Sequence, residues 1–275
     1  MRELFETVLI LSAIGFALTA ILLCLKPITA KKFSAKWQYY IWIAVLLTMV
    51  IPTYKLIPKQ QVQQIRRIAP IEAPRIFSVP YEPSRELLPP PDITPGIGLT
   101  VSESYVAKPD ILDVMTTVWI VGVILFLTVV LLSYILYLWH NRKQAVSMED
   151  SPLLTDIRKE LNIRRHIRVR MSPTVGSPML VGVFFPVIYI PCRELSKDMM
   201  RLVLLHELTH YKRKDLIVKW FSLLVNAVHW FNPLSYLVCA NLSDACELSC
   251  DGKVTRNMNE EEQKQYMKII LALVE

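Results

Sequence analysis

The sequence predicts an α+β membrane protein: three membrane-spanning helices carry a domain of short strands and further helices. Three observations support this class. Hydrophobic residues make up 53% of the 275 positions and the mean hydropathy is +0.35, whereas soluble domains usually hold roughly 45–50% apolar residues. Three apolar stretches are long enough to cross a bilayer, which needs about 20 residues. A later stretch rich in Val, Ile, Phe and Tyr, punctuated by Gly and Pro, is typical of short strands.

The first two spans are expected within residues 1–57. Residues 4–25 form a long apolar run after a nearly neutral start, which favours a retained span over a cleaved signal peptide. A second span is expected at 37–57, with aromatic residues near its ends. The loop between them contains no acid and four lysines, Lys26, Lys31, Lys32 and Lys36. Because positive loops favour the cytoplasm, we expect the N-terminus outside.

Residues 58–111 are expected to form a Pro-rich extracytoplasmic loop. Ten of the 18 prolines fall between 58 and 110, which excludes a long helix. The loop either connects two spans or has a ligand-sensing or dimer-stabilising role. The third span is predicted at 112–139 and is followed by Arg142 and Lys143, so residues 140–275 are expected in the cytoplasm.

Charge and cysteine content restrict the function classes. The net charge is +7, but Lys and Arg lie beside apolar stretches and are not interleaved with aromatic residues. This pattern favours membrane topology and contact with anionic membrane lipid and argues against direct nucleic-acid binding. Five cysteines without a C-x-x-C pair do not predict a disulfide framework, which fits a reducing compartment.

The domain after the third span is expected to begin with an amphipathic helix over 151–170, started by Ser151 and Pro152. A basic run at its end (Arg164, Arg165, Arg168, Arg170) is interpreted as a solvated or lipid-facing surface. Residues 171–191 predict two short strands with at least one exposed edge, because prolines confine strands to edges or ends.

The motif H-E-x-x-H, formed by His206, Glu207 and His210, follows on a helix that Ser196 is expected to cap. On a helix, residues four apart lie on one face, so the two imidazoles can share one zinc ion, Zn²⁺. Glu207 would lie close enough to take a proton from a zinc-bound water. A free strand edge beside the metal either covers this helix or pairs with an extended substrate.

The third metal ligand is expected beyond His210, where the candidates are Asp215, His229, Asp244, Glu247 and Asp251. Glu247 can complete a His, His, Glu set, while Cys246 or Cys250 is the competing ligand; cysteine ligands usually mark closed structural sites. Asp251, one turn after Glu247, can accept the free imidazole N–H of a ligand histidine. Asp215 is expected in a similar supporting position.

The apolar run at 216–240 is predicted to be a helical hairpin. A single crossing there would place His210 and Glu247 on opposite sides of the bilayer, where one zinc ion could not join them. Pro233 should also end a helix near Asn232. His229 is then either a buried hairpin residue or a stabiliser of the transition-state oxyanion. The last helix, capped at Asn259, stops in mid-pattern, so we expect a truncated C-terminus.

The stretches HELTHYKRKD, HWFNPLSY and ELSCD, after GSPMLVGVFFPVIYIP and the paired N-terminal spans, resemble the integral-membrane zinc metallopeptidases of the beta-lactam sensor–transducer type, the MecR/BlaR-type antirepressor family. Members switch on resistance genes by causing cleavage of a cytoplasmic repressor. The resemblance implies a gluzincin-like domain inserted in a helical domain of a bacterial cell membrane. It also implies His206, His210 and Glu247 as ligands, Glu207 as general base, homodimers and self-cleavage.

One departure limits what the resemblance implies. Members that sense beta-lactams carry a further span and a C-terminal penicillin-binding domain. This sequence has no S-x-x-K nucleophile motif and no room for that domain, so the activating signal is not assigned.

Three functions therefore remain in view. The first is a zinc endopeptidase in signal transduction that cleaves a cytoplasmic repressor or itself. The second is a housekeeping membrane protease of the heat-shock or prenyl-protein type, which would cut many substrates. The third is a non-catalytic receptor or assembly subunit, which would keep its function without the Glu207 carboxylate.

Overall fold

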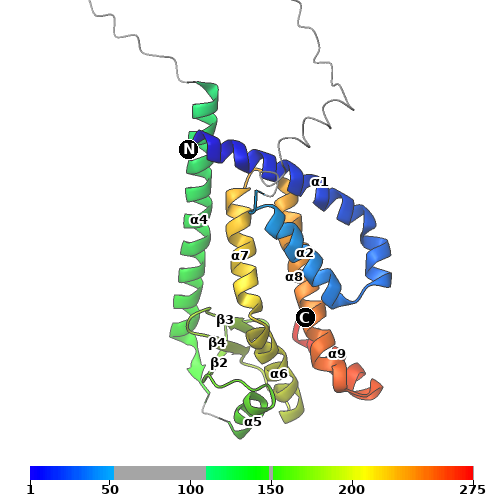
Figure 1. Ribbon diagram of the computed structural model, residues 1–275. Coiled ribbons are helices and arrows are strands. Elements are labelled where there is room, and N and C mark those ends of the chain that lie inside the picture. Colours follow the sequence, from blue (N-terminus) through cyan, green and yellow to red (C-terminus); the bar gives the residue numbers. More distant parts are fainter. Residues whose placement is uncertain (53–109, 149–150, 275) are drawn as a thin grey trace, which may run out of the picture. The chain divides into compact units, whose positions relative to one another are not determined.

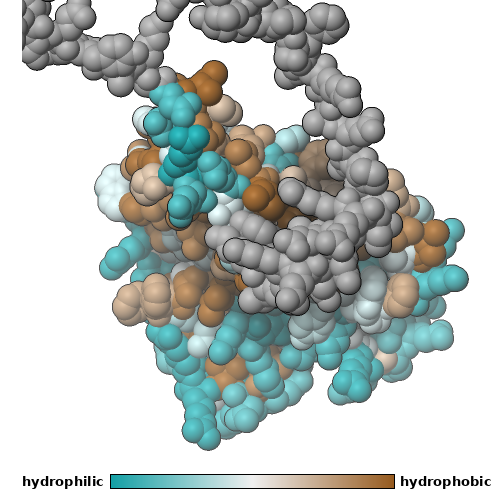
Figure 2. Space-filling model, turned by 45° about the horizontal axis from the view of Figure 1, so that its top comes forward, coloured by the Kyte–Doolittle hydropathy of each residue, from teal (hydrophilic) through white to brown (hydrophobic). Residues whose placement is uncertain are grey.

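The computed structural model describes residues 1–52, 110–148 and 151–274, and these are mostly helical with one small sheet (Figure 1). Nearly all of the predicted extracytoplasmic loop lies outside the described residues, so its character stays a prediction. Residues 1–52 and 115–275 form one compact unit. Figure 2 shows both hydrophobic and hydrophilic residues on one face of the molecule.

Two described helices are long and apolar enough to cross a membrane: α1 (Arg2–Lys32) and α4 (Ile111–Gln144). Only 28% and 6% of their most apolar segments are buried. On α4, large apolar side chains such as Val121, Leu125 and Leu136 are more than half exposed. A lipid environment explains this exposure, because lipid tails are as apolar as these side chains. A helix is suited to lipid because it satisfies its own backbone hydrogen bonds. They coincide with the predicted spans at 4–25 and 112–139.

The helix after the lysine-rich loop, α2 (Ala35–Thr48), is shorter than the predicted span at 37–57. Its 14 residues reach about 21 Å, less than a hydrocarbon core of about 30 Å. Pro52 cannot donate a backbone hydrogen bond and disfavours helical backbone before it. Residues 53–57 lie outside the described chain, so a third span stays a prediction. In the described part, α2 buries Trp42 and Leu46 against α8.

One four-stranded sheet follows α4, in the order β1-β2-β4-β3. The strands are β1 (Val146–Ser147), β2 (Arg168–Ser172), β3 (Met179–Val181) and β4 (Val187–Pro191). β2 and β4 are parallel, and the other pairs are antiparallel. The hairpin of β3 and β4 confirms the predicted strand pair, and β3 forms an edge of the sheet as expected.

The predicted helix over 151–170 is wrong in its second half. Helix α5 (Pro152–Glu160) begins where expected, with the Ser151 hydroxyl accepting from the Leu153 amide. The helix ends because Asn162 adopts left-handed backbone with φ of 53°. Residues 168–172 are instead strand β2. Ile167 and Val169 are buried while Arg168 is exposed, an alternation of period two that marks a strand.

Three helices then carry the site region: α6 (Lys197–Arg213), α7 (Asp215–Val228) and α8 (Pro233–Val254). The Ser196 hydroxyl caps α6 as predicted, accepting from the Met199 amide. Lys214, with φ of 62°, separates α6 from α7. Helices α7 and α8 lie side by side and run in opposite directions (Figure 1), which confirms the predicted hairpin.

The chain continues through the short helix η2 (Thr255–Asn257) into α9 (Glu260–Val274). Asn259 and Glu262 cap α9 reciprocally, each side chain accepting from the other's backbone amide at 2.9 and 2.8 Å. A core cluster between the sheet, α5 and α6 includes Ile188, Ile190, Leu204 and Leu208. It fixes the inner face of α6, so the face with the motif is turned toward α8.

The turn of the α7–α8 hairpin is tied to the two long helices. The Asn232 amide donates to the Ser12 hydroxyl of α1 at 2.9 Å, and its oxygen caps α8 by accepting from the Leu234 amide at 3.0 Å. On α4, the Trp119 indole donates to the Val228 carbonyl at 2.8 Å. The turn of the hairpin therefore packs against α1 and α4, and the start of α7 and the end of α8 both lie away from this turn.

We predict that Asn232→Ala destabilises the protein by about 1–3 kcal/mol, because it removes a helix cap and leaves buried polar groups of α1 unpaired. Thermal unfolding in detergent measures this change. Asn257→Ala, at an exposed position, is the control. Equal melting of the two variants would contradict the role of this turn.

Candidate metal centre

The H-E-x-x-H motif lies in the middle of α6, with all three of its functional side chains buried. His206, Glu207 and His210 are 8%, 7% and 7% exposed. Residues four apart on a helix lie on one face, and the imidazole rings accordingly stand 4.7 Å apart at their centroids. The motif thus has the helical context that its chemistry needs.

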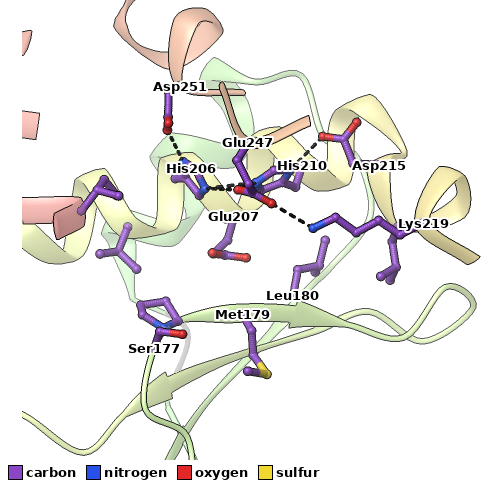
Figure 3. A pocket seen from close by; sticks show the side chains of 14 residues that line it. Ser177, Met179, Leu180, His206, Glu207, His210, Asp215, Lys219, Glu247 and Asp251 are labelled. Atoms are coloured by element: carbon purple, nitrogen blue, oxygen red, sulfur yellow. Dashed lines mark hydrogen bonds and ion pairs between the residues drawn. The ribbon is translucent and has the colours of Figure 1, made fainter. Parts of the chain in front are cut away.

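Glu247 of α8 meets both histidines at one point (Figure 3). The Nε2 atoms of His206 and His210 lie 3.0 Å apart. The Glu247 Oε2 atom lies 3.1 Å from His210 Nε2 and 3.5 Å from His206 Nε2. The three donor atoms therefore form a compact triangle that joins two helices distant in sequence.

The size of this triangle fits a zinc ion. Ligand atoms about 2.0–2.1 Å from a tetrahedral zinc lie roughly 3.3 Å from one another. The chemistry of the donors also fits, because both Nδ1 atoms face acceptors and so carry the ring protons. The Nε2 atoms then present lone pairs to each other, and a shared cation relieves that repulsion. The residues present thus fit the metal.

Each histidine is oriented through its second nitrogen. His210 Nδ1 lies 2.8 Å from the Asp215 carboxylate. His206 Nδ1 lies 2.7 Å from the Tyr266 oxygen and 3.3 Å from Asp251. Tyr266 donates its only hydroxyl proton to Asp251 at 2.6 Å, so its oxygen accepts from His206. Such partners fix the tautomer and the ring orientation of a metal ligand.

The second oxygen of Glu247 is held by Lys219 of α7 at 2.9 Å. Burial lowers the pKa of Lys219, but the Glu247 charge outweighs burial and raises it overall. This contact gives the lone lysine of the apolar hairpin a specific partner. It also leaves one Glu247 oxygen directed at the two histidines.

The site favours positive charge where the Nε2 atoms meet. Burial lowers the pKa of His206, but hydrogen bonds with Asp251 and Glu247 outweigh burial and raise it to about 10. Burial raises the pKa of Glu247, yet hydrogen bonds from both histidines lower it well below its usual range. A divalent cation can take the place of the protons that these shifts favour.

Glu207 lies beside the triangle and faces a cavity of about 440 Å³. The cavity is bounded on its other side by Ser177, Met179 and Leu180, at the edge strand β3 (Figure 3). Burial raises the pKa of Glu207, although the neighbouring imidazoles oppose the change. A carboxylate of raised basicity beside a metal position and an open cavity can accept a proton.

The two cysteines that compete with Glu247 are buried behind the motif. His206, His210 and Cys250 have donor atoms within 4.8 Å of one another, as do His210, Asp215 and Cys246. Neither cysteine lines the cavity, whereas Glu247 does. An open catalytic site needs ligands that face the cavity, so this geometry favours Glu247.

The structure brings five of the residues predicted from sequence to one site beside Glu207: His206, His210, Glu247, Asp251 and Asp215. It does not bring His229 there. His229 lies at the hairpin turn with its Nε2 atom 3.0 Å from the Met49 carbonyl, which agrees with the alternative of a buried hairpin residue. Asp244 is exposed on α8.

The sequence interpretation missed Tyr266 and Lys219. Tyr266 is fully buried and comes from α9, more than 50 residues after the motif. A large polar aromatic residue on the apolar face of a predicted helix was its only signal. Lys219 is a charged residue within an apolar run, which is a signal in the sequence, but its partner depends on how α7 packs against α8.

The fold and the site together combine features typical of membrane metallopeptidases: two helices suited to crossing a bilayer, an H-E-x-x-H helix and a converging carboxylate. The chain belongs to the BlaR1 peptidase M56 family, because the sequence model of that family matches residues 6–275. This confirms the family resemblance predicted from the motifs.

Three relatives illustrate the similarity. The regulatory protein BlaR1 of Bacillus licheniformis is 33% identical over 159 residues, which are 56% of this chain and 26% of that protein. The methicillin resistance mecR1 protein of Staphylococcus aureus is 29% identical over 111 residues, 39% of this chain and 19% of that protein. The regulatory protein BlaR1 of Staphylococcus aureus is 24% identical over 274 residues, 96% of this chain and 45% of that protein. The chain thus spans less than half the length of these relatives.

We predict that Tyr266→Phe weakens zinc binding roughly 10- to 100-fold, because His206 loses its nearest hydrogen-bond acceptor. Competition with a chelator, followed by the metal content of the purified full chain, measures the change. Tyr211→Phe, at a tyrosine of α6 outside the cavity lining, is the control. Unchanged affinity in Tyr266→Phe would show that Tyr266 only fills space.

Proposed function

We propose that this protein is a membrane-embedded zinc endopeptidase of the gluzincin type that acts in signal transduction. The observation that carries this proposal is the convergence of His206, His210 and Glu247 beside Glu207 at an open cavity. In this assignment His206, His210 and Glu247 hold the zinc. Asp215 and Asp251 orient the histidines.

The bound zinc would supply a polarised water and would polarise the peptide carbonyl that the water attacks. Glu207 then acts as general base and takes a proton from that water. It transfers the proton to the departing amine nitrogen. Burial of Glu207 supports this role, because burial raises its pKa and a carboxylate of higher pKa is a stronger base.

The edge strand β3 is proposed to align the substrate. Its outer edge is not paired within the described sheet, and its residues line the cavity opposite the motif helix. An extended peptide can add to such an edge through backbone hydrogen bonds. The scissile bond would then lie between β3 and the zinc position.

For the membrane setting, we propose three spans with the N-terminus outside and the zinc domain in the cytoplasm of a bacterial cell. The lysine-rich loop and the basic end of α4 support this orientation. The substrate would be a cytoplasmic repressor or the chain itself. We also propose that the protein forms homodimers. The names of the relatives, regulatory proteins and a methicillin resistance protein, support a signalling role over a housekeeping one.

We predict that Glu207→Gln retains zinc but cleaves roughly 10²- to 10⁴-fold more slowly, because the general base is lost while the ligands stay. The measurement compares newly formed protein N-termini in cells expressing each form. A short set of cleavage sites, in one regulator or in this chain, should be lost with Glu207→Gln.

Glu194→Gln is the matched control, because Glu194 is an exposed carboxylate outside the cavity lining. Cleavage that persists in Glu207→Gln would refute the mechanism. Broad loss of cleavage across many membrane proteins would support the housekeeping alternative.

A further inference from the structure

A second cavity, of about 650 Å³, lies between the start of α2, the end of α6 and the end of α8. Four cations line it, and its lining contains no Asp or Glu: Lys36, Arg213, Lys253 and Arg256. Hydroxyl groups add to this lining, from Ser34, Tyr39, Tyr40 and Ser249. A cavity whose charged side chains are all cations suits an anion with several oxygen atoms.

Arg213 brings a largely buried charge to the wall of this cavity. Its Nε atom lies 3.2 Å from Asp215, and its guanidinium lies 5.0 Å from the ring centroid of Tyr39. The Nη1 atom is buried and has no hydrogen-bond partner among the described residues. Leaving a buried charged donor unpaired is costly. An anion in the cavity would lie near this guanidinium and would stabilise its charge.

The cations also repel one another. Burial lowers the pKa of Lys253, and the charges of Lys212 and Arg213 lower it further. The side chains of Lys36, Lys253 and Arg256 are exposed, so an anion can reach them. Binding would offset this repulsion at the mouth of the cavity.

The position of the cavity favours a membrane lipid as the source of the anion. The cavity adjoins the turn at 33–34, where α1, one of the two helices suited to crossing the membrane, passes into α2. Phe33 and Trp37 stack there with ring centroids 4.1 Å apart. Aromatic and basic residues at the end of a span mark the headgroup layer of a bilayer.

We propose that this cavity binds the headgroup of an anionic phospholipid. Arg213 and Lys253 would contact the phosphate, and Lys36 and Arg256 would flank it at the mouth. None of the proposed zinc ligands lines this cavity, and its existence does not depend on peptidase activity. The ligand chemistry is a phosphate diester, and the membrane is its source.

The test is retention of lipid by the purified full chain in detergent, read by native mass spectrometry after exposure to equal amounts of phosphatidylglycerol and phosphatidylcholine. The wild type should retain phosphatidylglycerol selectively. Lys253→Gln/Arg256→Gln should bind it at least about tenfold more weakly, because two of the four cations are removed.

The matched control is Lys159→Gln/Lys197→Gln, which removes the same charge from exposed positions outside the cavity and should retain the lipid. Zinc content checks that the variants are folded. Equal retention of phosphatidylglycerol by both double variants, or of both lipids by the wild type, would overturn the proposal. Displacement by millimolar inorganic phosphate would assign the site to a soluble anion instead and would overturn the lipid assignment.

Discussion

The contact on which this structure depends is the meeting of α6 and α8 at His206, His210 and Glu247. Three donor atoms within 3.5 Å of one another repel unless a proton or a metal cation lies between them. Their convergence requires that the histidine motif of α6 and Glu247 of α8 lie on the same side of the membrane. The α7–α8 hairpin satisfies this requirement, because its turn at 229–232 reverses the chain among the spans.

Around that contact, side chains from α7 and α9 hold the three residues in place. Asp215 begins α7, Tyr266 comes from α9 and Lys219 from the middle of α7. Asp215 also accepts from the Tyr39 hydroxyl of α2 at 3.1 Å and contacts Arg213. The histidine that Asp215 orients is thus connected to α2 through one buried carboxylate. A change in how α2 packs would reach His210 through this carboxylate.

Much of the site could be predicted from sequence because its signals are local or depend on membrane topology. The motif spacing identified His206, Glu207 and His210. The need for an open site favoured Glu247 over the cysteines, and the same-side requirement then predicted the hairpin. Tyr266 could not be predicted, because its role arises from how α9 packs on α6. Strand β2 was missed because a basic run hid the alternation of Ile167 and Val169. The length of α2 depends on its packing against α8 and on Pro52, which apolar content does not reveal.

The central claim is that one zinc ion is bound by two imidazoles and one carboxylate at the meeting of α6 and α8. X-ray absorption spectroscopy of the zinc-loaded full chain tests it most directly. We predict only nitrogen and oxygen ligands, at about 2.0–2.2 Å. A sulfur ligand at about 2.3 Å would place Cys246 or Cys250 on the metal and contradict the assignment of Glu247.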